Sequence, residues 1–531
     1  AFSRPIRWLL ALHGGQAIPF KFAGLTAGRN SRGLRFDEQP TFTAADPAAY
    51  RQEMKRRGII LDAEERQAEI RRQVEILAEE VGAEIVEDPA LFQEVTHLVE
   101  TPTALRGRFD ESFLQLPRPV LISVMRKHQR YFALEKQGEL VHYFVTVRNG
   151  GDENLDSVRA GNEDVLRARF EDAAFFVERD LAQPFESYLA QLKTLTFESS
   201  LGSMRDKVER VEALIPKVAE WLSLDQEQRV AAQRAAHLSK ADLATQMVVE
   251  MTSLQGEMGR IYAEMAGENE AVAVAIAEHY LPRYSGDRVP ESKVGLALGI
   301  ADRLDSLIGL FSAGMEPSGG GDPFALRRTA IGLVEALVAH QQPLDLRRAL
   351  AAAADGLPIE SGPETLEACL AFIRRRQQSL LLAEGHRHDV VRAVLSEQGH
   401  DPARAKRAVG ELEAWMDRES WPAILQNYAR CVRITRDLDE KYEVDPSAFE
   451  EAESRALWEL LQQAESGKGE DGSVDRFMSA FLPLVPAIEA FFDEVLVMAE
   501  REAVKRNRLG LLQRVAMLAQ GVSDLSEVEG F

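Results

Sequence analysis

Cysteines and long apolar runs are both scarce in this sequence. Only two cysteines, Cys369 and Cys431, occur among 531 residues. Two cysteines exclude a disulfide framework and a cysteine-ligated metal cluster, and they favour a reducing, cytoplasmic setting. No run approaches the ~20 consecutive apolar residues of a membrane-spanning helix, and no segment has the pattern of a secretory signal. We therefore expect a cytoplasmic protein with no membrane partner.

Several short catalytic motifs are also missing. The sequence contains no G-x-x-x-x-G-K-[ST] loop for phosphates, no G-x-S-x-G nucleophile turn and no H-E-x-x-H metal motif. Its one dense glycine run, 319–321, leads into Asp322 and Pro323, where a phosphate would meet a carboxylate instead of free amides. We predict that this chain has no catalytic residues, no metal site and no cofactor of its own.

The length and composition are those of a multidomain globular protein. At ~150 residues per domain, 531 residues predict three or four domains. A hydrophobic fraction of 45% and a charged fraction of 28% are typical of chains with buried cores. The 63 basic and 85 acidic side chains give a net charge of −22. An acidic surface repels phosphates, so this charge at first argues against a nucleic-acid partner.

The residue pattern changes along the chain and predicts a multidomain α+β fold. Residues 1–190 form a mixed α/β region, and residues 191–345 carry helical periodicity without further strands. A Pro- and Gly-rich stretch at 342–363 marks a boundary, and residues 346–531 are again all helical.

Individual elements can be placed within these regions. The spacing of apolar residues predicts a helix over 61–81. Strand-like composition predicts strands at 120–125, 131–134 and 140–147, the last two joined as a hairpin. Asp322 is expected to cap a helix whose first residue is Pro323.

Histidine and aspartate recur on successive helices of the middle region, at positions that resemble a metal-dependent phosphohydrolase of the HD type. The positions are His237, Lys240, Asp242, His279 and Asp302. HD chemistry needs an adjacent His-Asp pair because two metals share close ligands. Lys240 stands at the pair position, and an ammonium group has no lone pair for a metal. We favour a degenerate HD-like domain kept as a scaffold, and an active phosphohydrolase is the alternative.

Basic side chains gather at one corner of the first region and at two places near the C-terminus. Arg430 and Arg433 are three residues apart and so line one side of a helix. Each cluster is either a solvated face or a contact for a phosphate backbone, which gives affinity without sequence readout. The candidates are Arg126, Lys127, Arg130, Arg430, Arg433, Lys505, Arg506 and Arg508.

Long sequence motifs occur one after another in all three regions. They cover 125–132, 161–170, 240–262, 278–282, 299–311, 322–328, 491–493 and 507–509. Together these segments resemble the β subunit of bacterial heterotetrameric glycyl-tRNA synthetase over essentially the whole chain. That family has a further N-terminal region, which we expect this chain to lack.

The resemblance implies an α2β2 enzyme whose class II α subunit activates glycine with ATP and Mg²⁺. The β subunit would supply most of the tRNA binding. Residues 1–190 would be a tRNA-binding or editing-like module of the B3/B4 type found in the phenylalanyl β subunit. Residues 191–345 would be an HD-like domain without metal ligands, and residues 346–531 a DALR-like anticodon-binding domain. The implied partners are the α subunit, glycine tRNA and a second β subunit.

We therefore interpret the chain as a tRNA-positioning subunit of glycine–tRNA ligase. An assembly adaptor that contacts no tRNA is a further alternative. The net charge no longer argues against RNA, because binding depends on fields within a Debye length of ~8 Å. Local basic strips on an acidic body would accept one tRNA and repel other polyanions.

Overall fold

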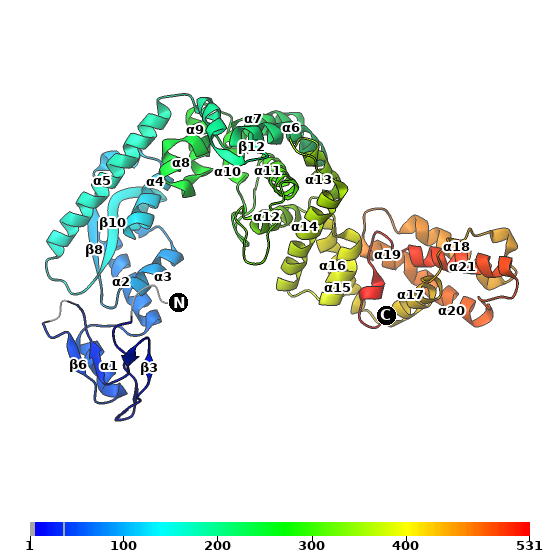
Figure 1. The fold of residues 1–531 in the computed structure, drawn as a ribbon, viewed down its shortest axis with the longest axis horizontal. Helices are drawn as coiled ribbons and strands as arrows, with labels where there is room; N and C mark the ends of the chain where they lie inside the picture. Colours follow the sequence, from blue (N-terminus) through cyan, green and yellow to red (C-terminus); the bar gives the residue numbers. More distant parts are fainter. Residues whose placement is uncertain (1–5, 36–37) are drawn as a thin grey trace. The chain divides into compact units, whose positions relative to one another are not determined.

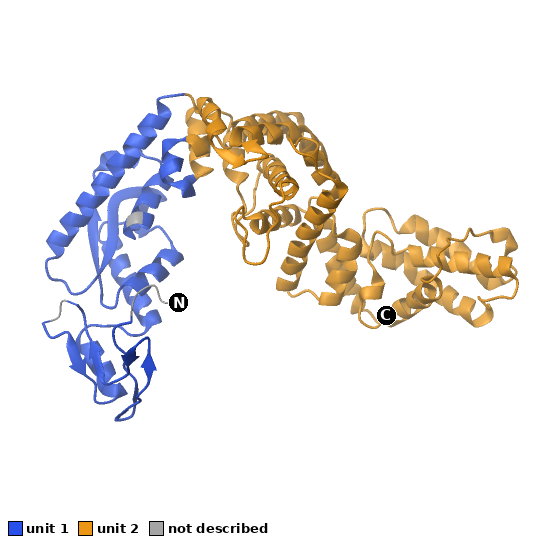
Figure 2. Cartoon of the chain, viewed as in Figure 1, with its two compact units in different colours: residues 1–183, 245–254 blue, residues 184–244, 255–531 orange. Residues whose placement is uncertain are grey.

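The computed structural model describes residues 6–35 and 38–531, and the chain divides into two compact units (Figure 2). The first unit comprises residues 1–183 and 245–254, and the second comprises 184–244 and 255–531. The short segment 245–254 thus belongs to the first unit although both of its neighbours in sequence belong to the second. The chain is mainly helical with small antiparallel sheets (Figure 1), which confirms the mixed α+β, multidomain expectation.

The first unit combines short hairpins, one larger sheet and several helices. Its elements are β1 (Leu12–His13), β2 (Gln16–Ala17), β3 (Lys21–Phe22), β4 (Leu25–Thr26), β5 (Asn30–Arg32), β6 (Thr41–Thr43), α1 (Pro47–Arg56), α2 (Ala63–Glu79), β7 (Glu84–Ile85), α3 (Pro89–Leu98), β8 (Pro102–Arg108), η1 (Glu111–Gln115), α4 (Arg118–Ser123), η2 (Val124–Gln129), β9 (Phe132–Lys136), β10 (Glu139–Asn149), α5 (Leu155–Leu181), α8 (Gln246–Glu250) and η5 (Thr252–Leu254).

The larger sheet has the order β7-β9-β10-β8, with every pair antiparallel. Strands β9 and β10 form the hairpin predicted from the sequence. Helix α2 confirms the predicted helix, and Asp62 caps it by accepting hydrogen bonds from two backbone amides. Apolar side chains of α2 and α3 pack on β9 and β10, with the rings of Phe92 and Phe132 4.5 Å apart. This core fixes the basic corner that precedes β9.

The strand predicted at 120–125 is wrong, because this stretch is helical. It lies in α4 and continues into the π-helix η2. Pro117 precedes α4 and another proline stands in its first turn, where a fixed φ favours helix. Val120 and Leu121 are fully buried. A short buried apolar run does not by itself distinguish a strand from a buried helix.

The second unit is almost entirely helical. Its elements are η3 (Phe185–Thr194), β11 (Thr196–Glu198), β12 (Gly202–Ser203), α6 (Met204–Trp221), α7 (Gln226–Leu238), η4 (Ala241–Ala244), α9 (Glu257–Met265), α10 (Glu270–Glu278), α11 (Lys293–Ser312), α12 (Leu326–Ala339), α13 (Leu346–Ala354), α14 (Pro363–Ala383), α15 (His388–Gln398), α16 (Pro402–Met416), α17 (Trp421–Thr435), η6 (Pro446–Ala448), α18 (Ala452–Gly467), α19 (Val474–Phe481), η7 (Leu482–Leu484), α20 (Val485–Glu494), α21 (Glu502–Met517) and η8 (Leu525–Glu527).

Helix α11 is buried along nearly its whole length, and α6, α7, α10, α12, α13 and α14 pack around it. A second apolar core joins the end of α14 to the helices that follow, as far as η8. The proposed boundary at 345/346 and the HD-like and anticodon-binding assignments stay predictions. In the described residues, no helix has both the length and the apolar character needed to cross a membrane.

Two local expectations for the second unit are corrected. The short hairpin of β11 and β12 lies beyond residue 190, where no strand was expected. Asp322 is not the N-cap residue of α12, which is Ala325, and the helix begins at Leu326 and not at Pro323. The two carboxylate oxygens of Asp322 accept from the amides of Leu326 and Arg327 at 2.8 and 3.0 Å. The carboxylate reaches across a turn that includes Ala325, whose φ is 55°.

Candidate functional site

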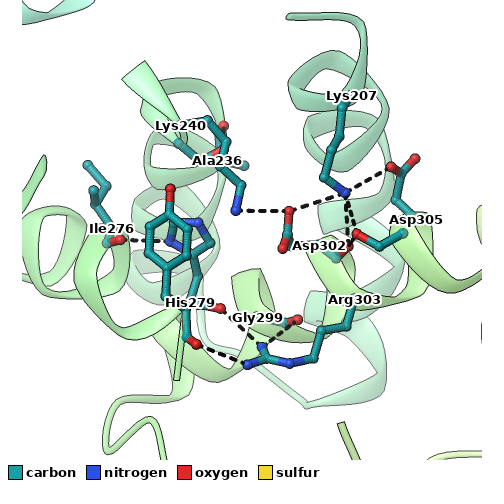
Figure 3. Close-up of polar contacts among 12 residues, drawn as sticks. Lys207, Ala236, Lys240, Ile276, His279, Gly299, Asp302, Arg303 and Asp305 are labelled. Carbon is teal, nitrogen blue, oxygen red and sulfur yellow. Dashed lines mark hydrogen bonds and ion pairs between the residues drawn. The ribbon is translucent and has the colours of Figure 1, made fainter. Parts of the chain in front are cut away.

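Some of the positions predicted as remnants of an HD site lie close together in the second unit. Lys240, His279 and Asp302 lie together around the buried helix α11 (Figure 3). The Nζ atom of Lys240 lies 3.2 Å from Oδ1 of Asp302 and 4.1 Å from the ring centre of Tyr280. Lys240 has a φ of 64° in the turn between α7 and η4. An ammonium group thus lies against the aspartate at a place where metal chemistry would need a metal-binding side chain.

A second ammonium group, Lys207 of α6, completes this cluster and was missed by the sequence reasoning. Its Nζ atom lies 3.3 Å from Asp302 and 3.0 Å from Asp305 (Figure 3). Arg210, one turn later on α6, also pairs with Asp305 at 2.6 Å. The i,i+3 spacing of Lys207 and Arg210 was a local signal for a shared face. Their aspartate partners are about 95 residues away in sequence.

Burial and charge act in opposite directions on the pKa values of this cluster. Burial alone raises the pKa of Asp302, but Lys207 and Lys240 outweigh it and hold that pKa below its usual value. Burial lowers the pKa of Lys240, although Asp302 partly opposes the shift. Asp302 is therefore an ionised counterion for ammonium groups at neutral pH, not a free metal ligand.

Asp242 and His279 are both fully buried, and their side chains form hydrogen bonds with backbone groups. Asp242 accepts a 2.6 Å hydrogen bond from the amide of Gly256, and burial raises its pKa. Nδ1 of His279 lies 2.7 Å from the carbonyl oxygen of Ile276, and burial lowers its pKa well below the usual value. Nε2 of His279 has no hydrogen-bond partner in the described part of the chain. Burial and the neighbouring Lys240 both favour the neutral imidazole.

Arg303, next to the cluster, fixes the chain that leaves α10. Its guanidinium donates to the carbonyl oxygens of His279, Gly299 and Leu281 (the His279 and Gly299 contacts are 3.0 and 3.1 Å). Burial lowers the pKa of Arg303 to about 10, so it stays charged at neutral pH. This clamp holds His279 in place by its backbone, which is a packing role.

His237 lies apart from this cluster. Its two ring nitrogens lie 3.1 Å from Glu212 and 3.1 Å from Glu186. Across residues 6–35 and 38–531, no group of three or more His, Cys, Asp or Glu side chains is placed to hold a metal ion. The geometry therefore favours the scaffold interpretation over a two-metal phosphohydrolase.

Arg430 and Arg433 lie on α17, each against an aromatic ring. The guanidinium carbon of Arg430 is 4.3 Å from the ring centre of Phe492, and that of Arg433 is 5.5 Å from the ring centre of Phe531. Neither guanidinium forms an ion pair with a carboxylate in the described ranges. A guanidinium stacked on a ring keeps its N–H edge available for a phosphate oxygen.

Lys505 and Arg506 lie near the start of α21 and are partly neutralised. Both pair with Glu502, at 3.4 and 3.2 Å, and Arg506 also lies 3.8 Å from Glu440. Arg506 remains exposed, with its guanidinium 5.4 Å from the ring centre of Tyr442. These ion pairs reduce the local positive field compared with that of α17.

Arg508 corrects an expectation, because its side chain is buried. Only 7% of the residue is exposed. Its guanidinium pairs with Glu451 and donates to the carbonyl oxygen of Leu496 at 2.8 Å. Buried donors already in use cannot reach a nucleic-acid backbone, so Arg508 anchors α21 instead.

The basic corner of the first unit is exposed at the end of η2. Arg126 pairs with Asp88 at 2.6 Å, and Arg130 pairs with Glu94 at 2.9 Å. Lys127 is exposed, and no carboxylate of the described residues pairs with it. The corner is close to electroneutral, apart from Lys127.

Comparison with known proteins gives one consistent family. The family described as "Glycyl-tRNA synthetase beta subunit" matches residues 1–396. The chain is 41% identical to "Glycine--tRNA ligase, chloroplastic/mitochondrial 2" of Arabidopsis thaliana, in an alignment that covers all of this chain and 50% of that protein. It is 40% and 37% identical to proteins named "Glycine--tRNA ligase beta subunit" from Moorella thermoacetica and Clostridioides difficile. In each of these, 99% of this chain aligns with 77% of the relative. The chain therefore spans half of the plant protein and about three quarters of the bacterial ones.

Proposed function

The chain belongs to the family of glycyl-tRNA synthetase beta subunits, and we propose that it is a tRNA-binding part of a glycine–tRNA ligase. Its partners would be an α subunit that activates glycine with ATP and Mg²⁺, glycine tRNA, and a second β subunit in an α2β2 enzyme. The contribution of this chain would be positional. Orientation of bound reactants is worth ~7–11 kcal/mol of a reaction barrier.

The observation that carries the proposal is the pair of stacked arginines on α17. In a chain with a net charge of −22, exposed arginines such as Arg130 and Arg506 pair with a carboxylate. Arg430 and Arg433 are stacked on rings instead, one turn apart on the same helix. Because phosphate contacts need a free N–H edge, this strip is a candidate for backbone contact.

Each predicted region has a part in this proposal. The C-terminal helices, with Arg430, Arg433, Lys505 and Arg506, would bind the anticodon arm. The HD-like helices would serve as a scaffold fixed by Lys207, Lys240 and Asp302. The first unit, with Arg126, Lys127 and Arg130, would make further contacts with the tRNA.

The test is a filter-binding titration of the full chain with glycine tRNA at several salt concentrations. Arg430→Glu and Arg433→Glu should each weaken binding and lower the slope of log K against log[salt] by about one. Arg260→Glu is the matched control, since Arg260 is exposed on α9 and pairs with Glu264 at 2.7 Å. Binding that is independent of salt and equal in all three variants would refute phosphate contact by α17. The absence of saturable tRNA binding would identify an assembly adaptor instead.

A further inference from the structure

Three arginines that pair with no carboxylate of the described residues gather where α12 packs on α14 in the second unit. We propose that Arg327, Arg375 and Arg376 form a phosphate-binding patch for RNA, distinct from the strip on α17. The inference rests on the proposed function, because it takes glycine tRNA as the partner. It adds a second region of contact with that tRNA.

A buried ring holds the two arginines of α14. Phe372 is only 3% exposed, and its ring lies 5.3 Å from the ring of Phe311 in α11. Arg375 and Arg376 follow Phe372 by three and four residues, so they lie on its side of the helix. Their guanidinium carbons are 6.0 and 5.1 Å from its ring centre. The ring thus positions both guanidinium groups without using their N–H donors.

Most N–H donors of the patch are free to bind a ligand. Arg375 is exposed, and within 6–35 and 38–531 it has no hydrogen-bonded or ion-paired partner for its guanidinium. In Arg376 only Nε is buried without a partner, so the terminal nitrogens reach solvent. Arg327 of α12 donates one N–H to the carbonyl oxygen of Gly319 at 2.7 Å. Guanidinium groups with free N–H edges suit phosphate oxygens.

The charges of the patch repel one another. Burial and the charges of Arg327 and Arg375 lower the pKa of Arg376, and Asp322 only partly opposes this shift. Both carboxylate oxygens of Asp322 already accept from backbone amides. Arg374 lies on another side of α14, where its side chain packs on Gly399. Cations held together without a paired carboxylate favour an anion from outside the chain.

The open position of these side chains favours a polyanion over a single small anion. Arg375 is exposed, and Arg327 and Arg376 are half-buried. Water competes well for a small anion at such a surface. A polynucleotide contacts several guanidinium groups at once and releases counterions for each contact. Such contacts read no bases, so the patch would orient the tRNA instead of selecting it.

The experiment is a filter-binding titration of the full chain with glycine tRNA at several salt concentrations. The double variant Arg375→Gln with Arg376→Gln should weaken binding at least ~10-fold and lower the slope of log K against log[salt] by about two. Arg347→Gln is the matched control, because Arg347 is exposed on α13 and already pairs with Asp345 at 2.7 Å. The control should bind like wild type. If the double variant fails to fold, Arg375→Gln alone should lower the slope by about one, since this side chain is exposed.

The outcomes separate this patch from the proposed function. Salt-dependent binding by wild type that is unchanged in the patch variants would overturn the patch and leave the proposed function standing. No tRNA binding by wild type would overturn both. Loss in the patch variants with no effect of Arg430→Glu or Arg433→Glu would support the patch and refute the α17 strip. Calorimetric binding of inorganic phosphate that is lost in the double variant, while tRNA binding is unchanged, would identify a small-anion site and overturn the RNA contact.

Discussion

Replacing Asp302 by asparagine is expected to destabilise the second unit by about 3–5 kcal/mol, although the shape of the side chain hardly changes. Asp302 is the shared counterion of Lys207 and Lys240, at 3.3 and 3.2 Å. Both lysine side chains are less than 10% exposed. Removing the carboxylate charge leaves two buried ammonium groups close together, of which Lys207 keeps its ion pair with Asp305.

The magnitude follows from burial and not from the number of ion pairs. A pair at the surface contributes ~0–1 kcal/mol, because water competes for both charges. Lys217 and Asp355 form such a pair at 3.5 Å, with side chains 49% and 76% exposed. Asp355→Asn is therefore the matched control, with an expected change below ~1 kcal/mol.

Urea unfolding followed by circular dichroism, with hydrogen exchange of α11 as the local readout, measures both variants. The double variant Asp302→Asn with Lys240→Met should recover part of the loss, because one uncompensated charge is removed along with its partner. Recovery of less than ~0.5 kcal/mol, or a loss for Asp302→Asn as small as for Asp355→Asn, would refute the charge argument.

The same prediction has a pH dependence with a defined sign. The pKa of Asp302 in the folded chain lies below its ordinary value of ~3.9. Its contribution to stability is therefore present above that ordinary pKa and is lost as the pH falls through the folded pKa. The difference between wild type and Asp302→Asn should be full above about pH 5 and should shrink below about pH 4.

Three further predictions concern packing and reactivity. Gly107→Ala should cost ~1–3 kcal/mol in thermal or urea unfolding, because a Cβ there would lie 2.4 Å from the buried ring of Phe144. Cys369 and Cys431 should resist alkylation by iodoacetamide in native protein and react after unfolding, because burial raises the pKa of both thiols; rapid native labelling would contradict this. Arg508→Met should lower the free energy of unfolding in urea by ~1–3 kcal/mol and leave the salt dependence of tRNA binding unchanged. A changed salt dependence would show that Arg508 does contact a phosphate.

Local signals in the sequence predicted the elements that local chemistry determines. The capped helix α2 and the hairpin of β9 and β10 follow from periodicity, a capping aspartate and strand composition. The strand prediction for 120–125 was wrong because this short apolar run shows no alternation with polar residues that would distinguish a strand from a buried helix. Its flanking prolines carried the correct signal.

The candidate sites were harder to predict, because they depend on contacts between distant residues. Lys207 looks like any helical lysine until α6 packs on α11, about 95 residues away. Arg506 and Arg508 look alike in sequence, yet one is exposed and the other is buried against Glu451. Two positions apart on a helix, they point to nearly opposite sides, and only the packing of α21 decides which side faces inward.

Because of the segment 245–254, the two units cannot be divided by a single cut in the coding sequence. Its helix α8 starts on Asp180 of α5, whose carboxylate accepts from the amides of Gln246 and Met247 at 2.7 and 3.0 Å. A fragment that stopped at residue 183 would remove these two donors from the buried carboxylate. The chain passes from one unit to the other three times, so neither unit is one continuous stretch that recombination could exchange.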